Sequence, residues 1–142
     1  MNKLNRNLRS QITSLTRKGE NFFDKQDYGR ALECFTSAYD LLPAPKENWD
    51  EGMQLLAGIG DSLFMQGKAQ EAYGYFSEAQ KCPGGAGNPF IWLRLGQCLY
   101  DMRGRKEAIL DALMSAYMLE GSEIFSDEDP KYLKFLKKHV KL

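Results

Sequence analysis

The chain has 142 residues, of which 43% are hydrophobic and 27% charged, the composition of one ordinary globular domain with a continuous core. No apolar run approaches the roughly 18 residues that a membrane span needs, so we expect no membrane partner. The net charge is zero because there are 19 basic and 19 acidic residues, but the two kinds of charge are segregated along the chain. Residues 20–129 contain nineteen acidic and nine basic residues, whereas residues 1–19 and 130–142 contain five basic residues each and no acidic one. The middle, with a net charge of −10, would attract a basic partner.

The N-terminal segment, residues 1–19, has the basic, acid-free composition of a transit peptide as well as the pattern of an ordinary helix. The helix is favoured, because an apolar stripe at helical spacing runs without a break into Gly19 and Phe22. We therefore expect the first helix to run from near Leu4 to Asp24. The members of the stripe are Leu4, Leu8, Ile12 and Leu15.

Capping signals define the second and third helices. Asp27 can cap the second helix, and Pro43 and Pro45 end it, because proline cannot continue a helix. Asn48 with Glu51 three residues later forms a capping box, which predicts that the third helix starts at Asn48.

The later helices are marked by glycine breaks and by proline after an N-cap residue. Asn88 followed by Pro89, and Asp129 followed by Pro130, each predict a helix start. No segment alternates apolar and polar residues like a strand, so the predicted fold class is all-α. The expected bounds are Ala69–Lys81 after a break at Gly67, Pro89 to about Met102, Arg105 to about Leu119, and Pro130 to Val140.

A repeated skeleton of small and large residues organises these helices. A glycine is followed twelve residues later by an alanine in three segments, and two of the segments continue with the same aromatic and alanine. A fixed spacing of this kind indicates stacked supersecondary units, none of which can bury its apolar face alone. The three sets are Gly19, Ala31, Phe35 and Ala38; Gly60, Ala72, Phe76 and Ala79; and Gly96 with Ala108.

The segment Trp92–Gly96 has the W-x-x-L-G pattern and resembles tetratricopeptide repeats (TPRs). The resemblance implies a right-handed superhelical stack of three helix–turn–helix units in a single domain, 1–142. Two departures lie in the turns. Gln26 replaces the turn glycine of the first unit, and Gly104 comes one residue late in the third, which predicts a displaced turn and a rotated second helix. The expected units are 12–45, 49–83 and 89–120, followed by a capping helix over 130–140.

The resemblance also implies that the first helix of each unit lines a concave groove. Helical spacing then places an acidic or amide residue, followed three residues later by an aromatic, on the groove side of every unit. Aromatic side chains are compact anchors and acidic ones select a basic partner, so we expect a protein-binding groove. Its predicted residues are Glu20, Phe23, Asp24, Gln54, Asp61, Phe64, Phe90, Gln97, Tyr100 and Asp101. Packing between repeats is the alternative role for the aromatic residues.

Other chemistry has little support in the sequence. Three cysteines, Cys34, Cys82 and Cys98, cannot all pair, and with no C-x-x-C spacing and a single histidine we expect no metal and no cofactor. Reduced thiols indicate a cytoplasmic protein. No convergent nucleophile and base are suggested, so we expect no enzyme.

Two further alternatives were weighed on loops and ends of the chain. The loop 84–88 lacks the strand and the Lys-Ser/Thr pair of a phosphate-binding loop, and Asp127–Asp129 lacks the spacing of a calcium loop. The basic final helix lies beside an acidic body that would repel phosphate, so we expect no nucleic-acid partner.

A second, narrower resemblance covers Gly87–Phe135, through Asn88–Ile91, Leu93–Gln97, Ala116–Gly121 and Glu128–Tyr132. These motifs resemble small bacterial TPR proteins found beside polymorphic toxins. That resemblance implies an immunity protein that binds and occludes a toxin domain with a basic surface. The alternatives are a secretion chaperone or adaptor that holds an extended peptide, and a scaffold that self-assembles through its basic ends. The sequence leaves the oligomeric state open.

Overall fold

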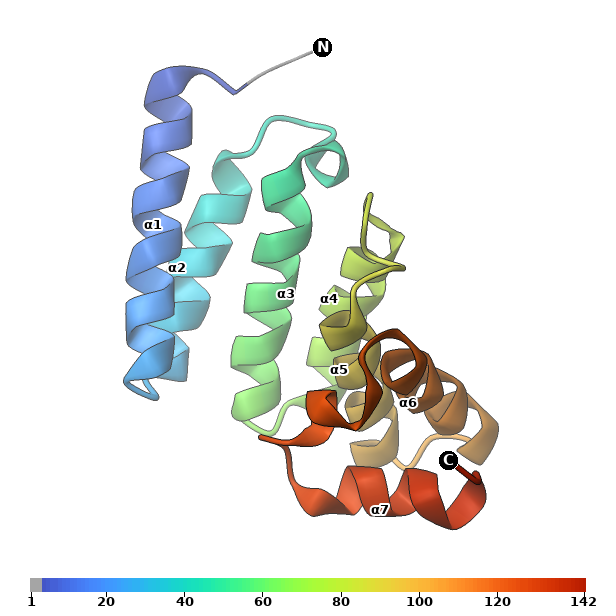
Figure 1. The fold of residues 1–142 in the computed structure, drawn as a ribbon. Helices are drawn as coiled ribbons and strands as arrows, with labels where there is room; N and C mark the ends of the chain where they lie inside the picture. The colour runs from blue at the N-terminus through green and yellow to red at the C-terminus, as the bar shows by residue number, and fades with distance from the viewer. Residues whose placement is uncertain (1–3) are drawn as a thin grey trace.

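The computed structural model describes residues 4–142, and over that range the chain forms α-helices and short 3-10 helices with no strand (Figure 1). The all-α prediction is therefore confirmed. The predicted domain also includes residues 1–3, which lie outside the described residues. The helices are α1 (Arg6–Asp24), α2 (Tyr28–Leu41), η1 (Lys46–Asn48), α3 (Asp50–Met65), α4 (Ala69–Lys81), α5 (Pro89–Asp101), α6 (Lys106–Glu120), η2 (Gly121–Phe125) and α7 (Pro130–His139).

Helices α1 and α2, α3 and α4, and α5 and α6 pack as three hairpins. The hairpins stack because α2 also contacts α3 and α4 contacts α5 (Figure 1). Helices α1, α3 and α5 thus share one side of the stack, which we call the first-helix face. It is the side on which the sequence predicts a groove. No helix within residues 4–142 has the length and apolarity to cross a membrane.

Each hairpin closes around a buried glycine in its first helix. An added Cβ at these glycines would overlap a side chain of the second helix, so glycine permits the close approach. In the third hairpin a leucine takes the place that phenylalanine has in the other two. The closest atoms would be Phe35 Cε1 at 2.7 Å from Gly19, Phe76 Cε2 at 2.9 Å from Gly60, and Leu113 Cδ2 at 2.5 Å from Gly96.

The prediction of a displaced turn in the third hairpin is wrong, whereas the predicted rotation of its second helix is confirmed by the residues that it buries. The left-handed turn residue lies seven positions after the buried glycine in every hairpin: Gln26 (φ 63°), Gly67 (φ 79°) and Arg103 (φ 57°). Gly104 is then an extra residue, so α6 starts one position later than α2 and α4 do. As a result Ile109 is buried in α6 and Ala108 is only half-buried, which corrects the repeat alignment.

The loop between the first two hairpins differs from the prediction. Asn48 is not the N-cap of α3; it lies in η1, and α3 begins at Asp50. The physical reason is that Lys46 reaches back to the end of α2, where its Nζ donates to the carbonyl oxygens of Tyr39 and Leu42 at 3.1 and 2.5 Å. Glu51, the expected partner of Asn48, instead pairs with Arg9 of α1 at 3.0 Å.

The other predicted N-caps are confirmed. Asp27 accepts from the backbone N–H of Arg30 at 3.2 Å, and Asn88 accepts from that of Phe90 at 2.9 Å. Asp129 caps α7 by accepting from the N–H of Lys131 at 3.0 Å. These caps satisfy backbone donors that have no partner inside a helix.

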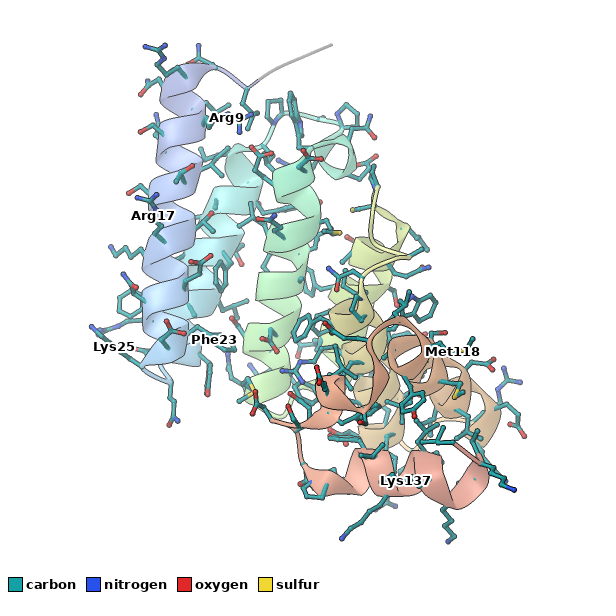
Figure 2. The ribbon with its side chains drawn as sticks, viewed as in Figure 1. Arg9, Arg17, Phe23, Lys25, Met118 and Lys137 are labelled. Atoms are coloured by element: carbon teal, nitrogen blue, oxygen red, sulfur yellow. The ribbon has the colours of Figure 1, made fainter. Side chains whose placement is uncertain are left out.

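Helix α7 closes the C-terminal end of the stack, as predicted. Tyr132 and Leu136 are buried in a cluster with Leu113 and Ala116 of α6 and Phe125 of η2. The lysines of α7 are exposed, and Figure 2 shows Lys137 extending away from the protein. The path to this cap is the unexpected feature: the segment between η2 and α7 crosses toward the C-terminal end of α3 before α7 begins (Figure 1).

Candidate partner-binding site

The C-terminal half of the first-helix face is organised around a buried arginine. Only 8% of the Arg94 side chain is exposed. Its Nε donates to Asp61 Oδ1 of α3 at 2.8 Å, and its Nη1 pairs with Glu128 from the segment before α7. Burying a charged group requires a counter-charge in good geometry, and Arg94 has two.

Gln97 completes this cluster one turn along α5. Its side-chain oxygen accepts from Arg94 Nη1 at 2.7 Å, and its amide donates to Glu128 Oε1 at 2.7 Å. Gln97 is fully buried, so a polar side chain on an apolar helix has its hydrogen bonds satisfied internally. We call Asp61, Arg94, Gln97 and Glu128 the Arg94 cluster.

Two aromatic rings contact the guanidinium of Arg94. Its Cζ lies 4.7 Å from the ring centroid of Phe64 and 4.8 Å from that of Phe90. Phe90 also packs edge-on against Phe76, with ring centroids 6.2 Å apart, so its ring stabilises the interior as well. A planar cation that contacts two π-faces gains from both contacts.

The Arg94 cluster contains two carboxylates and one cation, and this excess of negative charge affects the pKa of Asp61. Burial removes water from the carboxylate and raises the pKa of Asp61 above its usual value. The charge and hydrogen bond of Arg94 lower that pKa in part, and the nearby charge of Glu128 raises it again.

Helix α7 covers the remaining end of the first-helix face. The Tyr132 hydroxyl donates to both carboxylate oxygens of Asp101, at 2.9 and 3.0 Å, and Lys131 Nζ lies 3.6 Å from Oδ1 of Asp101. Tyr100 packs edge-on against Tyr132 and Phe135, with ring centroids 5.4 and 5.3 Å away. Burial and the bond to Asp101 raise the pKa of the Tyr132 hydroxyl, which therefore stays protonated.

The N-terminal half of the same face is open. A hollow of about 230 Å³ lies between α1 and α3. Glu20 and Gln54, both exposed, lie on its wall, and Arg17 is the one cation that lines it. The full lining is Ile12, Thr13, Thr16, Arg17, Glu20, Glu51, Gln54 and Leu55.

A second hollow, of about 280 Å³, marks the boundary between the open and covered halves; we call it the junction pocket. Phe23, at the end of α1 that lies near α3 (Figure 2), and Phe64 of α3 form its aromatic side. The segment from Asp127 to Asp129 forms its acidic side. Its lining residues are Phe23, Phe64, Met65, Arg94, Asp127, Glu128, Asp129 and Tyr132.

The ten predicted groove residues thus separate into three groups. Glu20 and Gln54 line the open hollow, Phe23 and Phe64 line the junction pocket, and Asp24 is exposed beside Phe23. The others are engaged by the chain itself: Asp61 and Gln97 in the Arg94 cluster, Phe90 on Arg94 and Phe76, and Tyr100 and Asp101 under α7.

Sequence reasoning missed the role of Glu128. Within the acidic run 127–129 the sequence assigns a role only to Asp129, as the helix cap that the structure shows. A signal was present: Arg94 lies on a helix whose neighbouring positions Leu93 and Leu95 are buried, so a buried arginine there needs carboxylates. The sequence could not say which of the many acidic residues supplies them.

Features elsewhere in the chain give less support for a functional site. A hollow of about 400 Å³ lies on the opposite side between α4 and α6, where Ser77, Ala108 and Ala112 are small. Burial raises the pKa of the Cys98 thiol to about 12, so this thiol stays protonated at neutral pH. The described part of the chain contains no group of three or more side chains that could hold a metal ion.

Comparison with known proteins gives the fold but no sequence relative. No protein-family model and no curated protein matches the sequence. Among solved structures, the first TPR of Spaghetti (RPAP3) bound to the HSP90 peptide SRMEEVD matches with a TM-score of 0.69 and 18% identity, over 91% of this chain and 90% of that one.

Two bacterial structures match at a similar level. The Yersinia enterocolitica type III secretion chaperone SycD, in complex with a peptide of the translocator YopD, has a TM-score of 0.70 and 15% identity over 91% of this chain and 92% of that one. PcrH from Pseudomonas aeruginosa has a TM-score of 0.70 and 13% identity over 96% and 94%. The chain therefore has the fold of a TPR domain, a stack of three helical hairpins with a capping helix.

Proposed function

We propose that the chain is a protein-interaction module that binds an extended, basic segment of a partner protein on the open half of its first-helix face. The observation that carries the proposal is that the open hollow and the junction pocket are both lined by residues of α1 and α3. The hollow contributes the polar side chains of Glu20 and Gln54, and the pocket contributes two rings and exposed carboxylates. Rings anchor a bound segment, and carboxylates select its charge.

A basic segment suits this surface better than an acidic tail does. Arg94 is the cation nearest to the pocket interior, and it is already paired with Asp61 and Glu128. An acidic peptide would have to displace Glu128 and would meet Asp127 and Asp129 at the rim. The acidic peptide bound by the Spaghetti domain therefore supports peptide binding as a mode, and the charge of the ligand is expected to differ.

The proposal is tested by selecting short random peptides against the full chain. We expect enrichment of arginine and lysine, and a fall in affinity as salt is raised. The double variant Glu20→Lys/Asp24→Lys should weaken the selected peptides by about tenfold or more, because both exposed acids would become cations. The matched control Glu71→Lys/Glu107→Lys changes exposed acids on α4 and α6 and should have no effect.

Two outcomes would refute the proposal. Equal affinity of the wild type and the Glu20→Lys/Asp24→Lys variant would exclude the open half as the site. An equal loss in the control variant would mean that net charge alone determines binding. Urea denaturation of all three proteins, with unchanged midpoints, ensures that lost binding does not reflect unfolding.

A narrower candidate within this function is an immunity protein that blocks a toxin domain. The observation that favours it is the net charge of −10 over residues 20–129, which would steer the chain onto a basic cleft. The test is co-expression with the product of the neighbouring gene. Cells that die equally with and without this chain would eliminate the candidate.

A secretion chaperone is the second candidate, favoured by the likeness of the fold to SycD and PcrH. It would hold an unfolded segment of an exported protein, whereas an immunity protein would hold a folded domain. Hydrogen exchange of the partner in the complex separates the two. For either role we propose a cytoplasmic location, in keeping with three buried cysteines that are not disulfide-bonded.

A further inference from the structure

The junction pocket, of about 280 Å³, is lined by aromatic residues of α1 and α3 and by acidic residues of the segment before α7. Phe23 and Phe64 supply the rings, and both are half-buried, so part of each ring is accessible. Met65 is 43% exposed at the edge, an unusual position for a large apolar side chain. An apolar surface beside carboxylates suits a ligand that is flat, apolar on its faces and positively charged.

The charges around the pocket leave a negative excess. Of its lining residues, Asp127, Glu128 and Asp129 are carboxylates and Arg94 is the single cation. Arg94 is paired with Glu128 and also with Asp61, so it neutralises neither Asp127 nor Asp129. Asp127 is exposed and makes no hydrogen bond or ion pair with any residue in 4–142 for which the structure gives such contacts.

The neighbouring Arg94 cluster displays the arrangement that the pocket offers to a ligand. There a guanidinium contacts the rings of Phe64 and Phe90 and is held by carboxylates. Phe64 also lines the junction pocket, together with a second ring, Phe23, and two further carboxylates, Asp127 and Asp129. The junction pocket thus has rings and carboxylates, as the Arg94 cluster does, but its lining supplies no second cation to pair with them.

We propose that the junction pocket binds one arginine side chain of the partner segment. The guanidinium stacks on Phe23 and Phe64 and pairs with Asp127, while the aliphatic part of the side chain contacts Met65. Arginine is preferred to lysine because its plane stacks on rings and its fork matches a carboxylate, whereas an ammonium ion is compact and strongly hydrated. The inference rests on the proposed function, since it names the residue that anchors the bound segment.

The test uses N-acetyl-argininamide as the probe, titrated into the full chain and followed by amide NMR shifts. We expect saturable shifts at Phe23, Met65 and Asp127. N-acetyl-citrullinamide has the same shape without the charge and should bind about tenfold or more weakly. Asp127→Asn and Phe23→Leu should each weaken argininamide by about threefold or more, whereas Asp50→Asn, an exposed acid at the far end of α3, should not.

The inference is overturned if the citrulline probe binds as tightly as the arginine probe, or if the shifts cluster away from the pocket. It is also overturned if Asp127→Asn leaves the affinity unchanged. Failure of the proposed function gives a different result. A peptide that responds to Glu20→Lys/Asp24→Lys but tolerates arginine-to-citrulline exchange refutes the arginine pocket alone. Argininamide binding without any selected peptide refutes the extended segment alone.

Discussion

The two halves of the first-helix face are built from equivalent positions of the repeats and yet differ in accessibility. Glu20 of α1 and Gln97 of α5 occupy the same place relative to the buried glycine of their hairpins. Glu20 is exposed on an open hollow, whereas Gln97 is fully buried under Glu128. The difference comes from the segment after α6, which covers α5 and stops at the end of α3. The position of a residue in its repeat therefore determines which face of the stack its side chain lies on. The chain beyond the repeats determines whether that side chain is accessible to a partner.

The largest expected effect is a loss of stability when the buried arginine of the covered half is replaced. Arg94→Met should lower the free energy of unfolding by about 3–5 kcal/mol, because Asp61 and Glu128 would stay buried without their cation. Urea denaturation measures the change. Arg105→Met, which alters an exposed arginine at the start of α6, is the matched control and should change stability by less than about 0.5 kcal/mol. A loss below about 1 kcal/mol for Arg94→Met would mean that the cluster contributes little.

The next prediction concerns the segment that covers the C-terminal half. Glu128→Ala should cost about 2–3 kcal/mol, because Arg94 and Gln97 both lose an acceptor. Hydrogen exchange should become faster in η2 and α7 and stay unchanged in α1 and α2. Asp127→Ala, one residue away and exposed, serves as the control. Uniformly faster exchange across all helices would contradict a local role for Glu128.

A smaller effect tests whether the first and third hairpins lose the same stability when a methyl group is added at their buried glycines. An added methyl at Gly96 would lie 2.5 Å from Leu113 Cδ2 and 3.1 Å from its backbone nitrogen, so Gly96→Ala should lose about 1–2 kcal/mol in thermal or urea unfolding. At Gly19 the three nearest atoms belong to the Phe35 ring, which can shift, so Gly19→Ala should lose less. Gly74→Ala has nothing within 4 Å and should gain up to about 1 kcal/mol. Equal losses at Gly19 and Gly96 would remove the distinction.

The smallest expected effect is a pH dependence within the Arg94 cluster. The pKa of Asp61 is raised in the folded state, so the folded protein binds the proton of this carboxyl group more tightly than the unfolded chain does. The contribution of Asp61 to the free energy of unfolding therefore falls as pH rises from about 4 through that raised pKa. Asp61→Asn removes this titration and keeps an oxygen for Arg94. The variant should therefore gain stability relative to the wild type as pH rises from about 4 toward neutrality. Urea midpoints measured over that range test the sign, and a gain toward acid would contradict it.

The sequence predicted the helices well because each of their starts and turns depends on nearby residues. Asp27, Asn88 and Asp129 cap helices through bonds to residues two or three positions away, and such contacts are visible in the sequence. The wrong start at Asn48 arose where Lys46 and Glu51 found partners in other helices. The one-residue shift of α6 arose because Arg103 adopts a left-handed conformation that glycine favours.

The candidate site was predicted less completely because it depends on a distant contact. Helical spacing placed Asp61 in one predicted series with Gln97, and Phe23 in another with Phe64. In the structure Asp61 and Gln97 both bond to Arg94, and Phe23 and Phe64 line one pocket. It could not show that Glu128, 34 positions after Arg94, would return to pair with it. Acidic residues are common throughout the middle of the chain, and nothing local distinguishes the one that is buried.

The pairing of Glu128 with Arg94 also limits how this architecture can be lengthened by engineering. A fourth hairpin joined directly after Glu120 would replace η2 and the turn before α7, and Arg94 would lose one of its two counter-ions. Extension of the array would then need a substitute carboxylate from the new hairpin. The third hairpin thus depends on Glu128, a residue that lies outside the three hairpins.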